Sequence, residues 1–315
     1  MSERLLWERD GRNWPHHAHS QFVDAAGLRW HVQQWPRTTS ASNPAATPAP
    51  ESAQTRQILL LHGTGASTHS WRGLAPLLAE HADVLALDLP GHAFTSMPAG
   101  GTSSVQLSLP GMAAAVAALL QTLGLQPTLV LGHSAGAAVA LRMALDGLAQ
   151  PHAIVGINAA LLPLRGLAGQ LFSPVAKLMA GSTLVPRFFS SHAGEPAVLK
   201  RLLESTGSSL DAEGMALYGQ LVSNPGHAAG ALGMMANWDL QTLADQLPRL
   251  AIPLDLLVGS RDHTVPPAQA DRVLARLQPG LPATLTRLAG LGHLAHEEQP
   301  GLVAELLRAK HFSAG

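Results

Sequence analysis

The stretch GHSAG, from Gly132 to Gly136, places a serine between two glycines directly after the apolar run TLVL. A serine hydroxyl becomes a nucleophile only when a base takes its proton and an acid orients that base. The run before Ser134 is typical of a buried strand, and AGAAVALRM after it is typical of a helix. A sharp turn from strand to helix exposes the hydroxyl at a helix N-terminus, and the glycines avoid clashes there. We therefore predict that Ser134 is a catalytic nucleophile.

An acid and a base for this nucleophile occur downstream, in the chain order serine, acid, histidine that such turns use. Asp262 follows the apolar run LDLLVG, and His293 follows the run ATLTRLAG. Loops at the carboxyl ends of parallel strands meet at one edge of a sheet. The sequence therefore predicts Asp262 as the acid and His293 as the base.

Four other residues compete for these two roles. Asp255 is expected inside a strand and Asp271 inside a helix, so neither should reach the serine. Asn158 ends the strand after the serine helix, but an amide cannot stabilise an imidazolium charge as a carboxylate does. His296 lies at the start of the last predicted helix, where a structural role is favoured.

Acyl transfer also needs backbone N–H groups that stabilise an oxyanion. The N–H of Ala135, directly after the serine, is the first expected donor. The second should come from HGTGAS, which follows the strand-like run QILLL. Within that loop we predict the N–H of Thr64, with Gly65 as the alternative.

Apolar strand-like runs alternate with helical segments through most of the chain, which is typical of an α/β fold with a mostly parallel sheet covered on both faces. The alternating residues 22–35 predict an N-terminal hairpin, and the Pro-, Ala- and Ser-rich residues 37–55 predict a flexible loop. Residues 161–248 have helical patterns without strand-like runs. We expect a core built from residues 1–160 and 249–315, with residues 161–248 forming a helical lid.

Composition excludes several other classes of protein. A net charge of −1 gives no basic footprint for nucleic acid, and the absence of cysteine excludes disulfides and thiolate catalysis. The first residues lack the apolar core of a signal peptide, and Gly and Pro interrupt the uncharged residues 102–141, so we expect a cytoplasmic protein without a transmembrane segment. His16, His17 and His19 lack carboxylates at ligand spacing, so we expect no metal and no cofactor.

The motifs LLLHGTGASTHSW, LALDLPGHAFTS, LVLGHSAGAAVALRM, VGSRDHTVPP and GLGHLAHEEQP together resemble the α/β-hydrolase family over nearly the whole chain. One departure is Ala93, where the family usually has glycine. The segments GLRWHVQQW, NAALLPLRGLAGQLFSPVAKLMA and AGALGMMANWDL are similar to the BchO family, described as magnesium-chelatase accessory α/β-hydrolases of bacteriochlorophyll biosynthesis. This resemblance implies a role in making photosynthetic pigment, without identifying a reaction.

The main functional prediction is serine hydrolysis of a bulky, apolar carboxylic ester. The turn lacks the nucleophilic aspartate of dehalogenases and epoxide hydrolases. Apolar lid residues would suit such a substrate, although ordinary packing of lid on core gives the same pattern. The family resemblance adds a tetrapyrrole ester as a candidate substrate. The candidate substrate-binding residues are Gly65, His133, Leu171, Phe172, Met234, Met235 and Trp238.

Two alternatives stay open at this point. The protein could be a non-catalytic tetrapyrrole-binding or accessory protein that acts with a magnesium-chelatase subunit, with an idle triad. Arg165, Lys177 and Arg187 interrupt an apolar lid, which leaves weak peripheral membrane contact as a further partner, although a lid over a pocket gives the same pattern.

Overall fold

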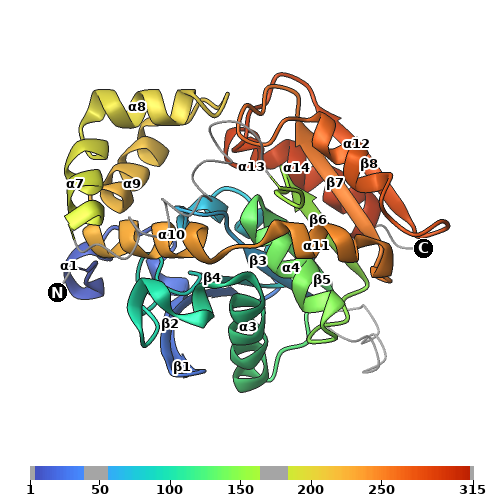
Figure 1. Cartoon of the computed structure of the whole chain (residues 1–315), viewed down its shortest axis with the longest axis horizontal. Helices are drawn as coiled ribbons and strands as arrows, with labels where there is room; N and C mark the ends of the chain where they lie inside the picture. Colours follow the sequence, from blue (N-terminus) through green and yellow to red (C-terminus); the bar gives the residue numbers. More distant parts are fainter. Residues whose placement is uncertain (1–3, 39–55, 164–183, 313–315) are drawn as a thin grey trace, which may run out of the picture.

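The computed structural model describes residues 4–38, 56–163 and 184–312, and its centre is one eight-stranded sheet (Figure 1). The strand order is β1-β2-β4-β3-β5-β6-β7-β8. The β1–β2 and β2–β4 pairs are antiparallel, and the other neighbouring strands are parallel. The strands are β1 Ser20–Ala25, β2 Leu28–Trp35, β3 Gln57–Leu61, β4 Asp83–Leu87, β5 Leu129–His133, β6 Ala153–Ile157, β7 Leu254–Gly259 and β8 Ala283–Leu288.

Helices cover both faces of the sheet because consecutive side chains of a strand point to opposite faces. Leu59 of β3 packs in one apolar cluster with α3, α4 and α12, and Leu60 packs in a second cluster with α2 and α14. Both faces of the parallel strands are therefore buried, as their continuous apolar runs predict. These helices are α2 Ala75–Ala79, α3 Leu109–Leu123, α4 Ala135–Leu145, α12 Ala268–Leu274 and α14 Pro300–Leu307.

Between β6 and β7 the secondary structure of the described residues is helical, and we call residues 184–249 the lid. In Figure 1, α7, α8 and α9 form a group beside the sheet, and α10 runs from this group toward α11. The lid elements are α7 Leu184–Ala193, α8 Pro196–Glu204, α9 Ala212–Val222, α10 Pro225–Asn237, α11 Leu240–Gln246 and η5 Leu247–Arg249. Residues 164–183 of the predicted lid lie outside the described part of the chain.

The remaining elements are short and lie at the N-terminus, in loops and at the C-terminal end. The predicted hairpin is confirmed as β1 and β2, whereas residues 39–55 of the predicted flexible loop lie outside the described residues. Within the described ranges, no helix is both long enough and apolar enough to cross a bilayer. The short elements are α1 Trp7–Asp10, η1 His17–His19, η2 Thr68–Trp71, η3 Gly101–Ser103, η4 Val105–Leu107, α13 Ala295–Glu298 and η6 Arg308–Phe312.

Candidate active site

Ser134 lies in a sharp turn between β5 and α4. Its φ of 50° and ψ of −113° fall outside the regions that L-residues prefer. A Cβ atom on Gly132 would lie 2.3 Å from the backbone nitrogen of Ala137, and one on Gly136 would lie 2.0 Å from the carbonyl oxygen of Leu61. The surrounding backbone therefore requires both glycines and holds the serine in a strained conformation. The predicted turn from strand to helix is confirmed, and the chemical role of the serine stays a prediction.

The loop at residues 62–66 lies directly beside this turn. A Cβ atom on Gly63 would be 3.1 Å from the Cβ of Ser134. The N–H of Ala66 donates to the carbonyl of Gly63 at 3.1 Å, with Gly65 at a φ of 76°. This bond closes a turn without using the N–H of Thr64 or Gly65. The structure therefore brings the loop of the predicted second oxyanion donor next to the serine.

The first predicted donor, Ala135, begins α4. The first N–H groups of a helix have no partner within the helix. The N–H of Ala135 therefore lies at the end of α4 that adjoins Ser134, where the helix dipole favours negative charge. This is the environment that an oxyanion needs, although the role of Ala135 stays a prediction.

The predicted acid and base are joined by a hydrogen bond. Asp262 lies in the loop after β7 and His293 in the loop after β8, and the Nδ1 of His293 is 2.8 Å from Oδ2 of Asp262. The other carboxylate oxygen accepts from the N–H groups of Thr264 at 2.8 Å and Val265 at 2.9 Å. Both side chains of the pair are almost fully buried. The aspartate therefore keeps the proton on Nδ1, which leaves Nε2 for proton transfer.

Two side chains hold the His293 loop against the serine turn. His133, which precedes Ser134, donates from Nε2 to the carbonyl of His293 at 2.9 Å, and the two rings are 4.8 Å apart. Asn158 donates to the same carbonyl at 2.7 Å and accepts from the N–H of Gly259 at 2.7 Å. Asn158 therefore connects the end of β7 to the base loop.

A family model for the alpha/beta hydrolase fold matches residues 57–300. The chain belongs to the α/β-hydrolase fold family. It is 42% identical over 244 residues to the magnesium-chelatase 30 kDa subunit of Rhodobacter capsulatus, a match that covers 76% of this chain and 81% of that protein. The predicted fold class and both family resemblances are confirmed by these two matches.

Two further matches cover most of this α/β hydrolase. The pimeloyl-[acyl-carrier protein] methyl ester esterase of Aeromonas hydrophila is 26% identical over 254 residues, which is 77% of this chain and 91% of that protein. The solved structure of the epoxide hydrolase CorEH without ligand superposes with a TM-score of 0.72 at 21% identity, over 92% of this chain and 97% of that chain. The structural match supports the fold alone.

The competing acids of this α/β hydrolase have other partners. Asp255 lies in β7, where it binds Lys310 and accepts from the Thr284 hydroxyl at 2.6 Å. Asp271 lies in α12 and pairs with Arg287 at 2.7 Å. The predictions that these aspartates occupy a strand and a helix are confirmed.

The competing base, His296, belongs to a buried network behind the site. Ser70 donates to Glu297 at 2.7 Å, so the Nε2 of His296, 2.8 Å away, donates to Ser70. Burial lowers the pKa of His296 to about 3. Glu297 also binds Arg72 at 2.8 Å and Tyr218 of α9 at 2.8 Å. Sequence reasoning missed this network, which ties the lid to the helix that follows the base loop.

The lid also touches the acid and base loops directly. The carbonyl of Thr206 accepts from the N–H of His263 at 3.2 Å and from that of His293 at 3.3 Å. A Cβ atom on Gly207, whose φ is 85°, would lie 1.8 Å from the carbonyl oxygen of Arg261. One lid turn therefore bridges the two loops that carry the predicted acid and base.

The predicted substrate-binding residues occupy different environments. Met234 of α10 is fully buried, and its sulfur accepts from the hydroxyl of Thr64 at 3.4 Å. Trp238 is nearly buried in the same apolar cluster, whereas Met235 is partly exposed. Met234 therefore lies beside the predicted oxyanion loop. Outside the described residues lie Leu171 and Phe172.

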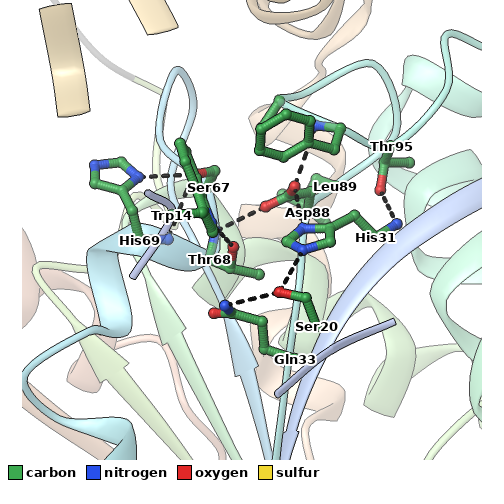
Figure 2. Close-up of polar contacts among 12 residues, drawn as sticks. Trp14, Ser20, His31, Gln33, Ser67, Thr68, His69, Asp88, Leu89 and Thr95 are labelled. Atoms are coloured by element: carbon green, nitrogen blue, oxygen red, sulfur yellow. Dashed lines mark hydrogen bonds and ion pairs between the residues drawn. The ribbon is translucent and has the colours of Figure 1, made fainter. Parts of the chain in front are cut away.

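Sequence reasoning missed another histidine–aspartate pair, in which both side chains are fully buried (Figure 2). His31 of β2 binds Asp88, after β4, at 2.7 Å, and its other ring nitrogen lies 3.0 Å from the hydroxyl of Ser20. Asp88 also accepts from the N–H groups of Thr68 at 2.7 Å and Phe94 at 3.2 Å. No signal in the sequence indicated this pair, because His31 occupies a polar position of the alternating run, between Trp30 and Val32.

Histidine is frequent in this chain, but no group of three or more histidine, aspartate or glutamate side chains in the described ranges is arranged to hold a metal ion.

Proposed function

We propose that this α/β hydrolase is a serine hydrolase that cleaves a carboxylic ester. The observation that carries the proposal is the 2.8 Å bond between His293 and Asp262, on a loop held against the strained turn of Ser134. A histidine oriented in this way can accept the serine proton at Nε2. The similarity to a methyl ester esterase supports an ester as the substrate class.

The reaction proceeds in two halves. The Oγ of Ser134 attacks the ester carbonyl while His293 takes its proton, and backbone N–H groups of residue 135 and of residue 64 or 65 stabilise the oxyanion. When the intermediate collapses, His293 returns the proton to the leaving alcohol and an acyl-serine remains. Water then attacks the acyl group with His293 as the base, which releases the acid and restores the serine.

Labelling with a fluorophosphonate tests this proposal, because the activated serine displaces fluoride from phosphorus. We expect stoichiometric labelling of Ser134, located by peptide mass spectrometry, and its loss in Ser134→Ala and His293→Ala. Ser20→Ala is the matched control, since Ser20 also faces a histidine that binds an aspartate. Folded wild-type protein that stays unlabelled, or label at another serine, would contradict the proposal.

We further propose that the substrate is bulky and apolar, with a tetrapyrrole ester as the first candidate, in bacteriochlorophyll biosynthesis. The supporting observations are the 42% identity to a protein named as a magnesium-chelatase subunit and the apolar side chains beside the oxyanion loop. The test compares turnover of porphyrin methyl esters with that of short aliphatic esters. Equal or lower kcat/KM for the porphyrin esters would contradict this choice of substrate.

The cytoplasmic location stays a prediction.

A second candidate function is non-catalytic binding or delivery of a tetrapyrrole to magnesium chelatase. The name of the 42% identical relative favours it, because that name describes a chelatase subunit and no hydrolysis. Under this alternative, the Ser134→Ala variant would stimulate the activity of magnesium chelatase to the same extent as the wild type. Under the proposed ester hydrolysis, the variant would lose this effect together with fluorophosphonate labelling.

A further inference from the structure

One face of the lid helix α10 packs on two loops at the carboxyl edge of the sheet. His227, Gly230 and Met234 recur at spacings of three and four, so they lie on one side of the helix. A Cβ atom on Gly230 would lie 2.0 Å from the carbonyl oxygen of Gly91, and Met234 contacts Thr64. Residue 230 therefore has to be glycine for this close approach, which joins α10 to the loop after β4 and to the predicted oxyanion loop.

His227 bonds to both of these loops through its ring. The N–H of Ala93 donates to Nδ1 at 2.9 Å, so the ring proton resides on Nε2. Nε2 lies 3.1 Å from the carbonyl oxygen of Gly65 and donates to it. The side chain is buried, and burial lowers its pKa to about 4, so a neutral ring keeps both bonds at neutral pH.

The bond to Gly65 fixes one peptide unit of the oxyanion loop at both of its ends. The carbonyl of this unit accepts from His227, and its N–H, which belongs to Ala66, donates to Gly63. A peptide unit bonded at both ends cannot rotate without breaking a hydrogen bond. The directions of the N–H groups of Thr64 and Gly65, the candidates for the second oxyanion donor, depend on this unit.

The other bond of His227 holds the residue at which the sequence departs from its family. Ala93 is buried and has a φ of 40°, in the region that favours glycine. The family pattern DLPGHG has glycine there, and the alanine is kept in this conformation with its N–H bonded to the lid. Ala93, where the sequence departs from the family pattern, and His227 of the lid are therefore joined by a hydrogen bond.

We propose that His227 is a positioning residue that couples the lid to the oxyanion hole by fixing the Gly65 peptide. This inference rests on the proposed serine hydrolysis and adds a role for a lid side chain in it. Because an oxyanion donor acts in the transition state, its misplacement lowers kcat and leaves substrate affinity nearly unchanged.

The test compares His227→Leu with His227→Gln in p-nitrophenyl ester hydrolysis. Leucine leaves the N–H of Ala93 and the carbonyl of Gly65 without the ring that bonds them, whereas glutamine carries one acceptor and one donor on either side of a single carbon, as the histidine ring does. We expect His227→Leu to lower kcat about 10- to 100-fold at constant KM, somewhat less than outright loss of an oxyanion donor costs. We expect His227→Gln to recover most of this loss.

A matched control separates positioning from simple loss of stability. Asn224 caps α10 by accepting from the N–H of His227 at 2.9 Å, so Asn224→Ala weakens the helix without removing the ring contacts. It should lower Tm and leave kcat of the folded protein unchanged. An equal fall of kcat in Asn224→Ala and His227→Leu, or no recovery by glutamine, would overturn the inference.

Amide hydrogen exchange provides a readout that needs no turnover. The N–H of Ala66 should exchange at least about 10-fold faster in His227→Leu than in the wild type or in Asn224→Ala, because the turn loses its anchor. Wild-type protein without fluorophosphonate labelling would contradict the proposed function. Labelled wild type together with unchanged kcat or unchanged Ala66 exchange in His227→Leu would contradict the role of His227 alone.

Discussion

Two histidine–aspartate pairs in this molecule have nearly the same hydrogen bond and very different surroundings. His293 and Asp262 are 2.8 Å apart, and His31 and Asp88 are 2.7 Å apart. The first pair lies on loops at the carboxyl edge of the sheet, beside a strained serine turn. The second lies where the N-terminal hairpin meets the loop after β4, and neither of its side chains is exposed.

The surroundings decide what each pair can do. His31 faces the hydroxyl of Ser20, but Ser20 lies in the regular strand β1, and Gln33 donates to the same hydroxyl at 3.1 Å. The rings of Trp7, Phe22 and Phe94 pack within 5.4 Å of the His31 ring. Ser20 is partly exposed and lies in a regular strand, without the strained turn and the helix N-terminus that adjoin Ser134. A Ser-His-Asp arrangement is therefore insufficient for catalysis, and here it connects three segments of chain.

The two pairs should differ most clearly when each aspartate is replaced by asparagine. Asp262→Asn should lower kcat about 10⁴-fold with little change in Tm, because the amide favours the wrong tautomer of His293. Asp88→Asn should leave kcat of the folded protein within a factor of about 3, a change of less than 1 kcal/mol. The measurement is ester hydrolysis normalised to folded protein. A large loss of kcat in Asp88→Asn would contradict the structural role of the buried pair.

Substitutions at the two pairs should affect stability in the opposite order, with the larger loss at the pair of His31 and Asp88. His31→Ala leaves the Asp88 carboxylate fully buried without the ring that binds it, so we expect a loss of about 3–5 kcal/mol in the free energy of unfolding. His293→Ala should cost less, because the His293 side chain is 8% exposed and that of His31 is 0% exposed, so water can more easily reach the Asp262 carboxylate once the ring is removed. Urea unfolding at pH 7 measures both. Equal losses in the two variants would remove the distinction between the pairs.

The pairing of Asp262 with His293 could be predicted from the sequence, whereas that of His31 with Asp88 could not, for a physical reason. Ser134, Asp262 and His293 each follow an apolar strand, so the parallel topology alone brings them to one edge. His31 and Asp88 meet only because the antiparallel hairpin adds β2 beside β4. Taken alone, neither residue differs from the other polar residues of its own segment. The contacts of His227 and Glu297 likewise depend on how the lid packs, which local patterns do not specify.

The pH dependence of stability should distinguish the pair of His31 and Asp88 from His296. Burial alone would raise the pKa of Asp88, but His31 and the hydrogen bonds to the carboxylate hold it at about 2. This stabilisation is complete above the ordinary carboxyl pKa and disappears as the pH falls toward 2. The pKa of His296, about 3, is below its ordinary value of 6.5, so the unfolded chain binds a proton between these values that the native state does not. Stability therefore falls with decreasing pH in that interval.

His296→Gln tests this assignment of the acid sensitivity. Removing one such histidine should reduce the slope of unfolding free energy against pH by about 1.4 kcal/mol per unit between pH 5 and 6. The glutamine amide can still donate to Ser70, so the network keeps a donor there. Chemical unfolding at three pH values gives the slope. A slope equal to that of the wild type would show that His296 is not a source of the acid sensitivity.

The smallest expected effect is the loss of stability on substitution of Ser20. Ser20→Ala removes the hydroxyl between His31 and Gln33, so we expect a loss of about 1 kcal/mol in stability and no change in kcat. Ser134→Ala should do the reverse, abolishing turnover while Tm stays near that of the wild type, since alanine also fits between Gly132 and Gly136. Measuring Tm and kcat of the two variants side by side tests both expectations. If Ser20→Ala lowered kcat, the hairpin would contribute to the reaction, and the buried pair would have to be regarded as part of the site.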